Sequence, residues 1–274
     1  MSTGGSGSWE TRWQAPGGMF SDDCTVNPAF CKMTRVYVKY CDGGSWSGNL
    51  AAPYLTPRAT LYFRGHLLLD ALLSSLADKG LGDAHTVVVS GCSAGGLTVL
   101  LQSDYIGEQL RSRYAPALRH YMAVSVSGFF LFADDLRGVP VYPNEMRRVF
   151  ERGNASAGVN TACVRAQKAG EEHKCISAAT TWAHMVTPTF IVNSAFDYWQ
   201  TSCILAAVPE DNATLPPSQF DPGCSDIPGW RKGECGYEVE GAAFTSSCNP
   251  SQMRQVAGYQ VRREKPRSRG VYCC

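Results

Sequence analysis

The chain has 274 residues, of which 44% are hydrophobic and 18% are charged, so one sizeable core can be buried. The formal net charge of +1 gives no reason to expect nucleic acid, an anionic membrane surface or a strongly charged substrate as a partner. The basic residues between 262 and 269 are interpreted as a solvated end of the chain.

The first third of the chain predicts a loop, a strand and a helix. Residues 1–18 are rich in Gly and Ser and are expected to form a loop. Apolar and polar residues alternate over 35–40, which predicts a strand, and residues 60–63 suit a short strand or the entry to a helix. The leucine-rich run 66–77 has helical spacing, and Gly80 is expected to end that helix.

The remaining pattern predicts three more strands and three more helices. The strands are 86–90, 121–126 and 189–193, and the helices are 97–110, 198–207 and 249–263. The first of these strands is rich in β-branched residues, which is typical of a parallel strand buried on both faces. Residues 209–242, rich in Pro, Gly, Asp and Cys, are expected to form a long loop or a small subdomain. This alternation predicts a single α/β domain over 1–274, with a mostly parallel central sheet and helices on both faces.

The 12 cysteines are many for a cytosolic enzyme and predict disulfides formed in an oxidising compartment. No C-x-x-C pair or Cys/His cluster has zinc-ligand spacing, so no metal or other cofactor is expected. Two sequons, at Asn154 and Asn212, agree with passage through the secretory pathway as a glycoprotein. The first residues have neither the basic nor the apolar region of a signal peptide. Either the natural start lies upstream, or the protein is intracellular and its cysteines are reduced.

The segment Gly91-Cys92-Ser93-Ala94-Gly95 matches G-x-S-x-G and lies between a predicted strand and a predicted helix. That context is typical of the sharp turn of the α/β-hydrolase fold, with Ser93 as nucleophile and the Ala94 N–H as an oxyanion donor. Two alternatives are an idle serine in a glycine-rich turn and an anion-binding turn, although no lysine follows as a P-loop requires. Cys92 is expected to be a small buried residue. Residues 86–103 are uncharged, but their glycines and hydroxyls favour this strand–turn–helix over a membrane span.

A serine nucleophile needs a base, and a third group must orient that base. Asp197 follows a predicted strand, where the orienting acid of this fold belongs, although capping the helix from residue 198 is a competing role. The five histidines, all before Asp197, are His66, His85, His120, His173 and His184. The expected order Ser, Asp, His therefore fails. A less favoured arrangement takes Asp134 or Asp135 as the acid, with His173 or His184 as the base.

Several segments spread across most of the chain carry a resemblance to a known family. They are Val38–Ser45, Phe63–Gly65, Ser90–Gly96, Asn193–Gln200 and Cys248–Gln252. By these segments and their order, the chain resembles the pectin acetylesterase family, which includes the Notum-type protein deacylases. The combination is far more specific than the serine motif by itself.

The resemblance implies an α/β-hydrolase fold, secretion, no metal, and a serine carboxylesterase that removes acyl groups from an esterified polysaccharide or a related substrate. It assigns Ser93 as nucleophile and Asp197 as triad acid, and it implies that Cys163 pairs with Cys175. Two family features find no match here: a Gly-Gly-Gly-Trp segment, and a Ser-Cys-x-x-His segment that carries the catalytic histidine. We therefore expect a fragment cut at both ends. The alternative is an inactive chain that keeps the fold as a binding protein. Trp46, near the matched segment Val38–Ser45, is expected either to stack on a sugar substrate or to pack in the core.

Overall fold

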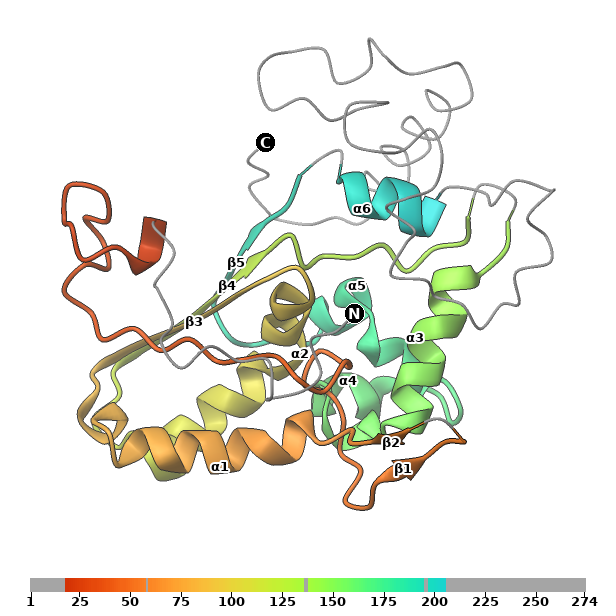
Figure 1. Ribbon diagram of the computed structural model, residues 1–274, viewed down its shortest axis with the longest axis horizontal. Helices are drawn as coiled ribbons and strands as arrows, with labels where there is room; N and C mark the ends of the chain where they lie inside the picture. Colours follow the sequence, from red (N-terminus) through yellow and green to blue (C-terminus); the bar gives the residue numbers. More distant parts are fainter. Residues whose placement is uncertain (1–17, 58, 136–137, 195–196, 206–274) are drawn as a thin grey trace, which may run out of the picture.

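The computed structural model describes residues 18–57, 59–135, 138–194 and 197–205 (Figure 1). Three parallel strands form the main sheet, and two short antiparallel strands form a separate pair. The strands are β1 Tyr54–Leu55, β2 Thr60–Leu61, β3 Thr86–Cys92, β4 His120–Val126 and β5 Thr189–Val192. The helices are α1 Gly65–Ala77, α2 Ala94–Gln109, α3 Val141–Arg152, α4 Thr161–Ala166, α5 Ala178–Trp182 and α6 Tyr198–Gln200. α2 and α6 continue as the π-helical turns Leu110–Tyr114 and Thr201–Leu205.

The main sheet brings the ends of its three strands together. β4 lies between β3 and β5, and both pairs are parallel. Cys92 pairs with Val126, which in turn pairs with Val192, so the three strands end side by side. The residues that follow the strands therefore meet at one edge of the sheet, which is where open α/β sheets bind their ligands.

Helices α1 and α2 pack against one face of this sheet. Along β4, Tyr121 and Ala123 are buried, whereas Met122 on the opposite face is 44% exposed. The predicted parallel sheet with covering helices is confirmed, and in the described residues the cover lies on this face. The expectation that β3 is buried on both faces is wrong for the described residues, because β3 is an edge strand on which Ser90 and Cys92 are exposed.

Two clusters of buried side chains lie between the sheet and the helices. The smaller cluster joins α1, the end of α2 and β4, and it contains Leu69, Leu73, Ile106, Leu110, Ala115 and Tyr121. Trp46 packs against this cluster, which supports its role in the core. The larger cluster contains Cys163 and Cys175, which are fully buried and bonded to each other, with their Cα atoms 5.9 Å apart. The predicted Cys163–Cys175 disulfide is thus confirmed.

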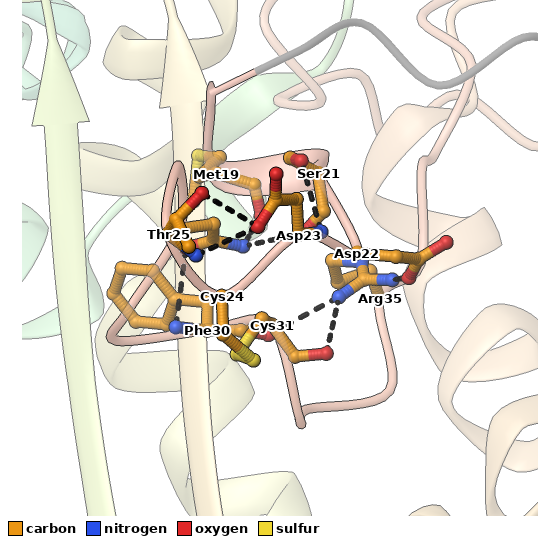
Figure 2. Close-up of a disulfide and its surroundings, with 10 residues drawn as sticks. Met19, Ser21, Asp22, Asp23, Cys24, Thr25, Phe30, Cys31 and Arg35 are labelled. Atoms are coloured by element: carbon orange, nitrogen blue, oxygen red, sulfur yellow. Dashed lines mark hydrogen bonds and ion pairs between the residues drawn. A yellow bond between two sulfur atoms is a disulfide. The ribbon is translucent and has the colours of Figure 1, made fainter.

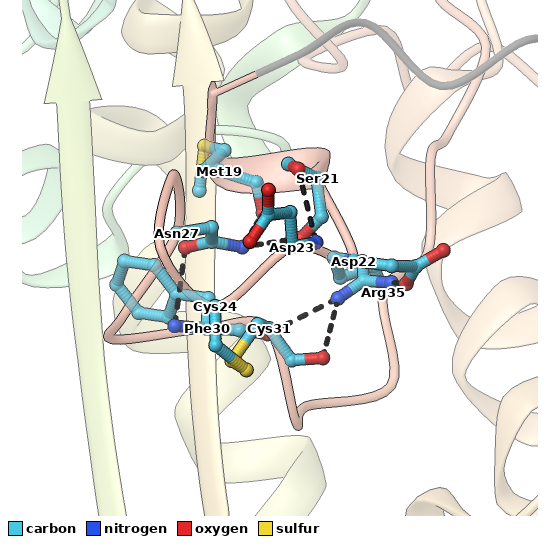
Figure 3. A network of polar contacts seen from close by, with 9 residues as sticks. All are labelled: Met19, Ser21, Asp22, Asp23, Cys24, Asn27, Phe30, Cys31 and Arg35. Atoms are coloured by element: carbon cyan, nitrogen blue, oxygen red, sulfur yellow. Dashed lines mark hydrogen bonds and ion pairs between the residues drawn. A yellow bond between two sulfur atoms is a disulfide. The ribbon is translucent and has the colours of Figure 1, made fainter.

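The first described segment is held by a disulfide and by side-chain contacts (Figures 2 and 3). Cys24 is bonded to Cys31. The buried Asn27 side chain donates to two backbone carbonyls of this loop at 2.9 and 3.0 Å. Arg35 donates to two more loop carbonyls at 3.0 and 3.2 Å and forms an ion pair with Asp22. The Arg35 side chain therefore stabilises this loop, and no strand begins at Arg35.

The strand predicted over 35–40 is wrong. These residues have no regular secondary structure, and no neighbouring strand of the described chain pairs with them. Val36, Tyr37 and Val38 are exposed by 49%, 49% and 39%. Consecutive exposed side chains do not follow the alternation of a half-buried strand, and an alternating sequence without a partner for its backbone N–H and C=O groups forms no ladder.

The other predicted elements that fall on described residues are confirmed within a few residues. Gly80, at φ 104°, follows the end of α1, and β2 occupies the start of the segment 60–63. The helix predicted from residue 97 begins at Ala94, and the one predicted from Tyr198 begins there. The predictions for 1–17, 209–242 and 249–263 lie outside the described residues. Among the helices that are described, none combines the length and apolar character needed to cross a bilayer.

Candidate active site

Ser93 occupies the sharp turn between β3 and α2. Its backbone has φ 57° and ψ −122°, which is costly for a residue with a side chain and recurs at functional turns. The Ser93 N–H donates to the Val126 carbonyl at 2.9 Å, and the Ser93 carbonyl accepts from the Leu97 N–H at 3.0 Å. The turn is therefore fixed to β4 on one side and to α2 on the other. This is the strand–turn–helix that the G-x-S-x-G segment predicts.

Glycines make this turn possible because its backbone passes close to other backbone. A Cβ atom on Gly91 would lie 2.2 Å from the Gly95 carbonyl oxygen. A Cβ on Gly96 would lie 2.6 Å from the Val126 carbonyl oxygen, and one on Gly128 would lie 2.2 Å from the Gly96 carbonyl carbon. Side chains at these positions would push the turn away from β4, so small residues are required on both sides of the serine.

The Ser93 side chain is exposed at the N-terminus of α2, and in the described residues its hydroxyl makes no hydrogen bond. The first N–H groups of a helix have no intrahelical acceptor and carry the positive end of its dipole. The Ala94 N–H is one of them, so negative charge beside Ser93 is favoured there. Cys92 is a free and exposed thiol, so the expectation of a buried residue is wrong. It is exposed because its side chain, like that of Ser90, lies on the face of β3 that the described helices leave uncovered.

Asp197 lies at the same edge of the sheet, after β5. One of its carboxylate oxygens accepts the Gln200 N–H at 2.9 Å, which makes Asp197 the N-cap of the short helix α6. The competing role noted from the sequence is therefore present. The structure brings Ser93 and Asp197 to the ends of strands in one sheet, and the triad role of Asp197 stays a prediction.

None of the five histidines lies beside Ser93. His85 precedes β3 and His120 begins β4, so both lie at the opposite edge of the sheet. His184 lines a cavity of about 520 Å³ with Asp104 and other residues from the second half of α2. At about 1.5 Å per helical residue, Asp104 is roughly 16 Å along the axis from Ser93. In the described residues, His184 forms no hydrogen bond with Ser93, so its role as the base stays a prediction.

The two remaining histidines have other partners. His66 contacts Gln102 on α2, with 3.2 Å between Nδ1 and Oε1, and its ring stacks on Tyr105 at 4.5 Å. Burial lowers the pKa of His66, and the contact with Gln102 opposes this shift. His173 contacts its own turn, with 3.2 Å between Nδ1 and the carbonyl oxygen of residue 170.

The arrangement with an earlier acid is not assembled either. Asp135 accepts the Val139 N–H at 3.0 Å within its own loop. In the described residues, neither His173 nor His184 forms a hydrogen bond with Ser93. In the described residues, no group of three or more His, Cys, Asp or Glu side chains is arranged to hold a metal ion.

The glycosylation candidates fall partly within the described chain. Asn154 is exposed in a turn, with φ 49°, and its side-chain nitrogen contacts the Asn49 carbonyl at 3.4 Å. An exposed turn is accessible to modification, so the Asn154 prediction is compatible with the structure. Asn212 lies outside the described residues.

The parallel sheet, the helix-covered face and the strained serine turn define an α/β hydrolase. The Pectinacetylesterase family profile matches residues 1–223, so the chain belongs to the pectinacetylesterase family. Pectin acetylesterase 5 of Arabidopsis thaliana is 31% identical over 243 residues, which make up 89% of this chain and 50% of that protein. Human palmitoleoyl-protein carboxylesterase NOTUM is 29% identical over 187 residues, which make up 66% of this chain and 36% of that protein. The chain spans about half the length of the curated relatives it matches.

Proposed function

We propose that this chain carries the nucleophile and the acid of a secreted serine carboxylesterase that removes acyl groups, including acetyl groups, from an esterified polysaccharide or a related substrate. The observation that carries the proposal is Ser93 at φ 57° between β3 and α2. The names of the relatives, pectin acetylesterase and palmitoleoyl-protein carboxylesterase, support ester hydrolysis as the reaction class. Asp197 is the proposed acid.

In this reaction the Ser93 hydroxyl oxygen attacks the ester carbonyl while a base removes its proton. The negative charge that develops on the carbonyl oxygen is stabilised by the Ala94 N–H and by the N-terminus of α2. Collapse of the tetrahedral intermediate breaks the ester bond, the base returns its proton to the leaving alcohol, and an acyl–serine remains. Water then releases the acid and restores the serine. Because none of the five histidines forms a hydrogen bond with Ser93, we propose that this base is a group outside the described residues.

That placement of the histidines favours a second candidate function, a non-catalytic protein that keeps the fold for binding. A base contributes about 10²–10⁴-fold to such reactions, so Ser93 without a base would be nearly inert. The two candidates share the fold and the turn, and they differ in whether the substrate ester is cleaved.

Hydrolysis of p-nitrophenyl acetate by the chain and two serine variants tests the proposal. Ser93→Ala should lose the activity. Ser127→Ala is a matched control: Ser127 also follows a strand, has φ 49°, and donates its N–H to Val192 at 2.7 Å, but no helix begins after it. A rate that falls in Ser93→Ala but not in Ser127→Ala would support the esterase. Equal rates for all three proteins would mean that this chain has no working base for Ser93, and binding of acetylated pectin without hydrolysis would then support the second candidate.

Location in the secretory pathway is part of the proposal. Two described disulfides, Cys24–Cys31 and Cys163–Cys175, and the exposed sequon at Asn154 support it. When the chain is directed into a eukaryotic secretory pathway, an N-glycosidase should increase its electrophoretic mobility, and Asn154→Gln should reduce this shift. A protein whose mobility does not change with the glycosidase would count against glycosylation.

A further inference from the structure

Two fully buried amide side chains stand on either side of Asp197. Asn193 directly follows β5, and Gln200 ends α6. Both side chains have 0% exposure. Buried polar side chains are costly unless hydrogen bonds satisfy them, so their partners indicate what the residues are for.

Both side chains bind one backbone segment, Phe129–Leu131, just beyond β4. Asn193 Oδ1 accepts the Phe129 N–H at 3.0 Å, and its Nδ2 has no hydrogen-bond partner in the described residues. Gln200 Oε1 accepts the Leu131 N–H at 3.0 Å, and its Nε2 donates to the Phe129 carbonyl at 3.3 Å. The turn that contains Asp197 is thereby attached to this segment at both of its ends.

The same segment is attached to the nucleophile turn. Gly128, immediately before Phe129, packs so closely on Gly96 of α2 that a Cβ there would lie 2.2 Å from Gly96 backbone. The residue before it, Ser127, donates its N–H to the β5 carbonyl of Val192 at 2.7 Å. Residues 127–131 therefore contact the Ser93 turn on one side and the Asp197 turn on the other.

We propose that Asn193 and Gln200 are positioning residues, which set the Asp197 turn relative to Ser93 by clamping residues 129–131. This inference rests on the proposed esterase function. Neither side chain is proposed to touch the substrate. Loss of the clamp would leave two N–H groups and a carbonyl without partners and would let the acid shift relative to the nucleophile. A displacement of about 1 Å can reduce turnover by roughly 100-fold.

The test compares two buried glutamines. Gln200→Leu removes the two hydrogen bonds that Gln200 contributes to the clamp, and Gln102→Leu is the matched control. Gln102 is 1% exposed, donates to the carbonyls of Trp46 and Gly158 at 2.8 and 2.6 Å, and lies in the middle of α2. Both variants should unfold at lower temperature than the wild type. Only Gln200→Leu should lower kcat for p-nitrophenyl acetate, by about 10–100-fold, with KM changed less than threefold.

A milder variant and a second measurement keep the outcome decisive. Gln200→Asn keeps the amide group on a side chain that is one methylene shorter, so it should fold and show an intermediate loss of kcat. If the wild-type chain hydrolyses no ester, kcat cannot be compared between the variants, and amide hydrogen exchange tests the clamp independently of the proposed function. Faster exchange over 127–131 in Gln200→Leu than in Gln102→Leu supports it. Equal kcat losses in the two Leu variants, or equal exchange where there is no activity, would overturn the inference.

Discussion

Two adjacent glycines of the Ser93 turn should respond to the same substitution in opposite ways. Gly95 and Gly96 are consecutive residues in the first turn of α2. A Cβ on Gly95 would meet nothing within 4 Å, whereas one on Gly96 would lie 2.6 Å from the Val126 carbonyl oxygen and 2.8 Å from the Gly128 Cα. We therefore expect Gly95→Ala to stabilise the chain and Gly96→Ala to destabilise it.

The magnitudes follow from these contacts. Taking about 3.5 Å as the closest comfortable separation, the Gly96→Ala methyl group must push the backbone apart by roughly 0.7–0.9 Å. Overpacking of this kind costs about 1–3 kcal/mol. The Gly95→Ala methyl group meets no resistance and lowers the entropy of the unfolded chain, which is worth about 0.5–1 kcal/mol. At about 2–4 °C per kcal/mol for a chain of this size, Tm should fall by roughly 2–12 °C in Gly96→Ala and rise by roughly 1–4 °C in Gly95→Ala.

The assay is thermal unfolding followed by circular dichroism, with the wild type and both variants in one buffer. Hydrolysis of p-nitrophenyl acetate by the same samples adds a second measure, because the Gly96→Ala methyl group moves the β4 carbonyl that holds the Ser93 N–H. A Gly96→Ala protein as stable as the wild type would refute the close packing of α2 on β4. A loss of stability in Gly95→Ala similar to that in Gly96→Ala would show that the open space beside Gly95 is wrongly assigned.

Three further predictions concern the rest of the chain. Replacing both Cys163 and Cys175 by Ser should cost about 3 kcal/mol, because their bond closes a loop over a separation of 12 residues, and an unchanged unfolding temperature without reductant would contradict this. The Asp42 carboxylate accepts three backbone N–H groups at 3.0, 3.1 and 3.4 Å, so Asp42→Ala should cost about 2–4 kcal/mol and Asp42→Asn less, as measured by urea unfolding. Burial lowers the pKa of His66 below its ordinary 6.5, so its stability contribution is complete above pH 6.5 and is lost as the pH falls from there through the folded-state pKa. Urea midpoints at about pH 7.5 and 5.5 should therefore differ less in His66→Gln than in the wild type, and equal differences would exclude His66 as a source of this pH dependence.

Helix α3 shows a local signal that the sequence analysis missed. Tyr142, Met146, Val149 and Phe150 recur at helical spacing and pack in or against the larger core cluster. Such a stripe is enough to predict an amphipathic helix. Pro143 lies in its first turn, where a missing N–H costs little, so it is no argument against the helix.

The sequence by itself determined the elements around Ser93. A β-branched run, a serine flanked by glycines and a leucine-rich continuation specify strand, turn and helix through interactions between near neighbours along the chain. The same local reasoning wrongly predicted a strand over 35–40. Alternation of apolar and polar residues is a property of one segment, whereas a β-strand also needs a second strand that pairs with its backbone.

Only the tertiary structure decided which of these residues meet. Ser93 and Asp197 follow strands in one sheet, and the side chains that join the segment around Asp197 to the loop after β4 bridge 64 to 71 residues of sequence. From the sequence, His184 is a candidate base. In the structure it lines a cavity with residues from the C-terminal half of α2. Cys92, a small residue expected to be buried beside the serine, is exposed on an edge strand of the described sheet. These outcomes depend on which elements pack together, because contacts between distant segments are set by the burial of whole faces and leave no periodic signal in the residues themselves.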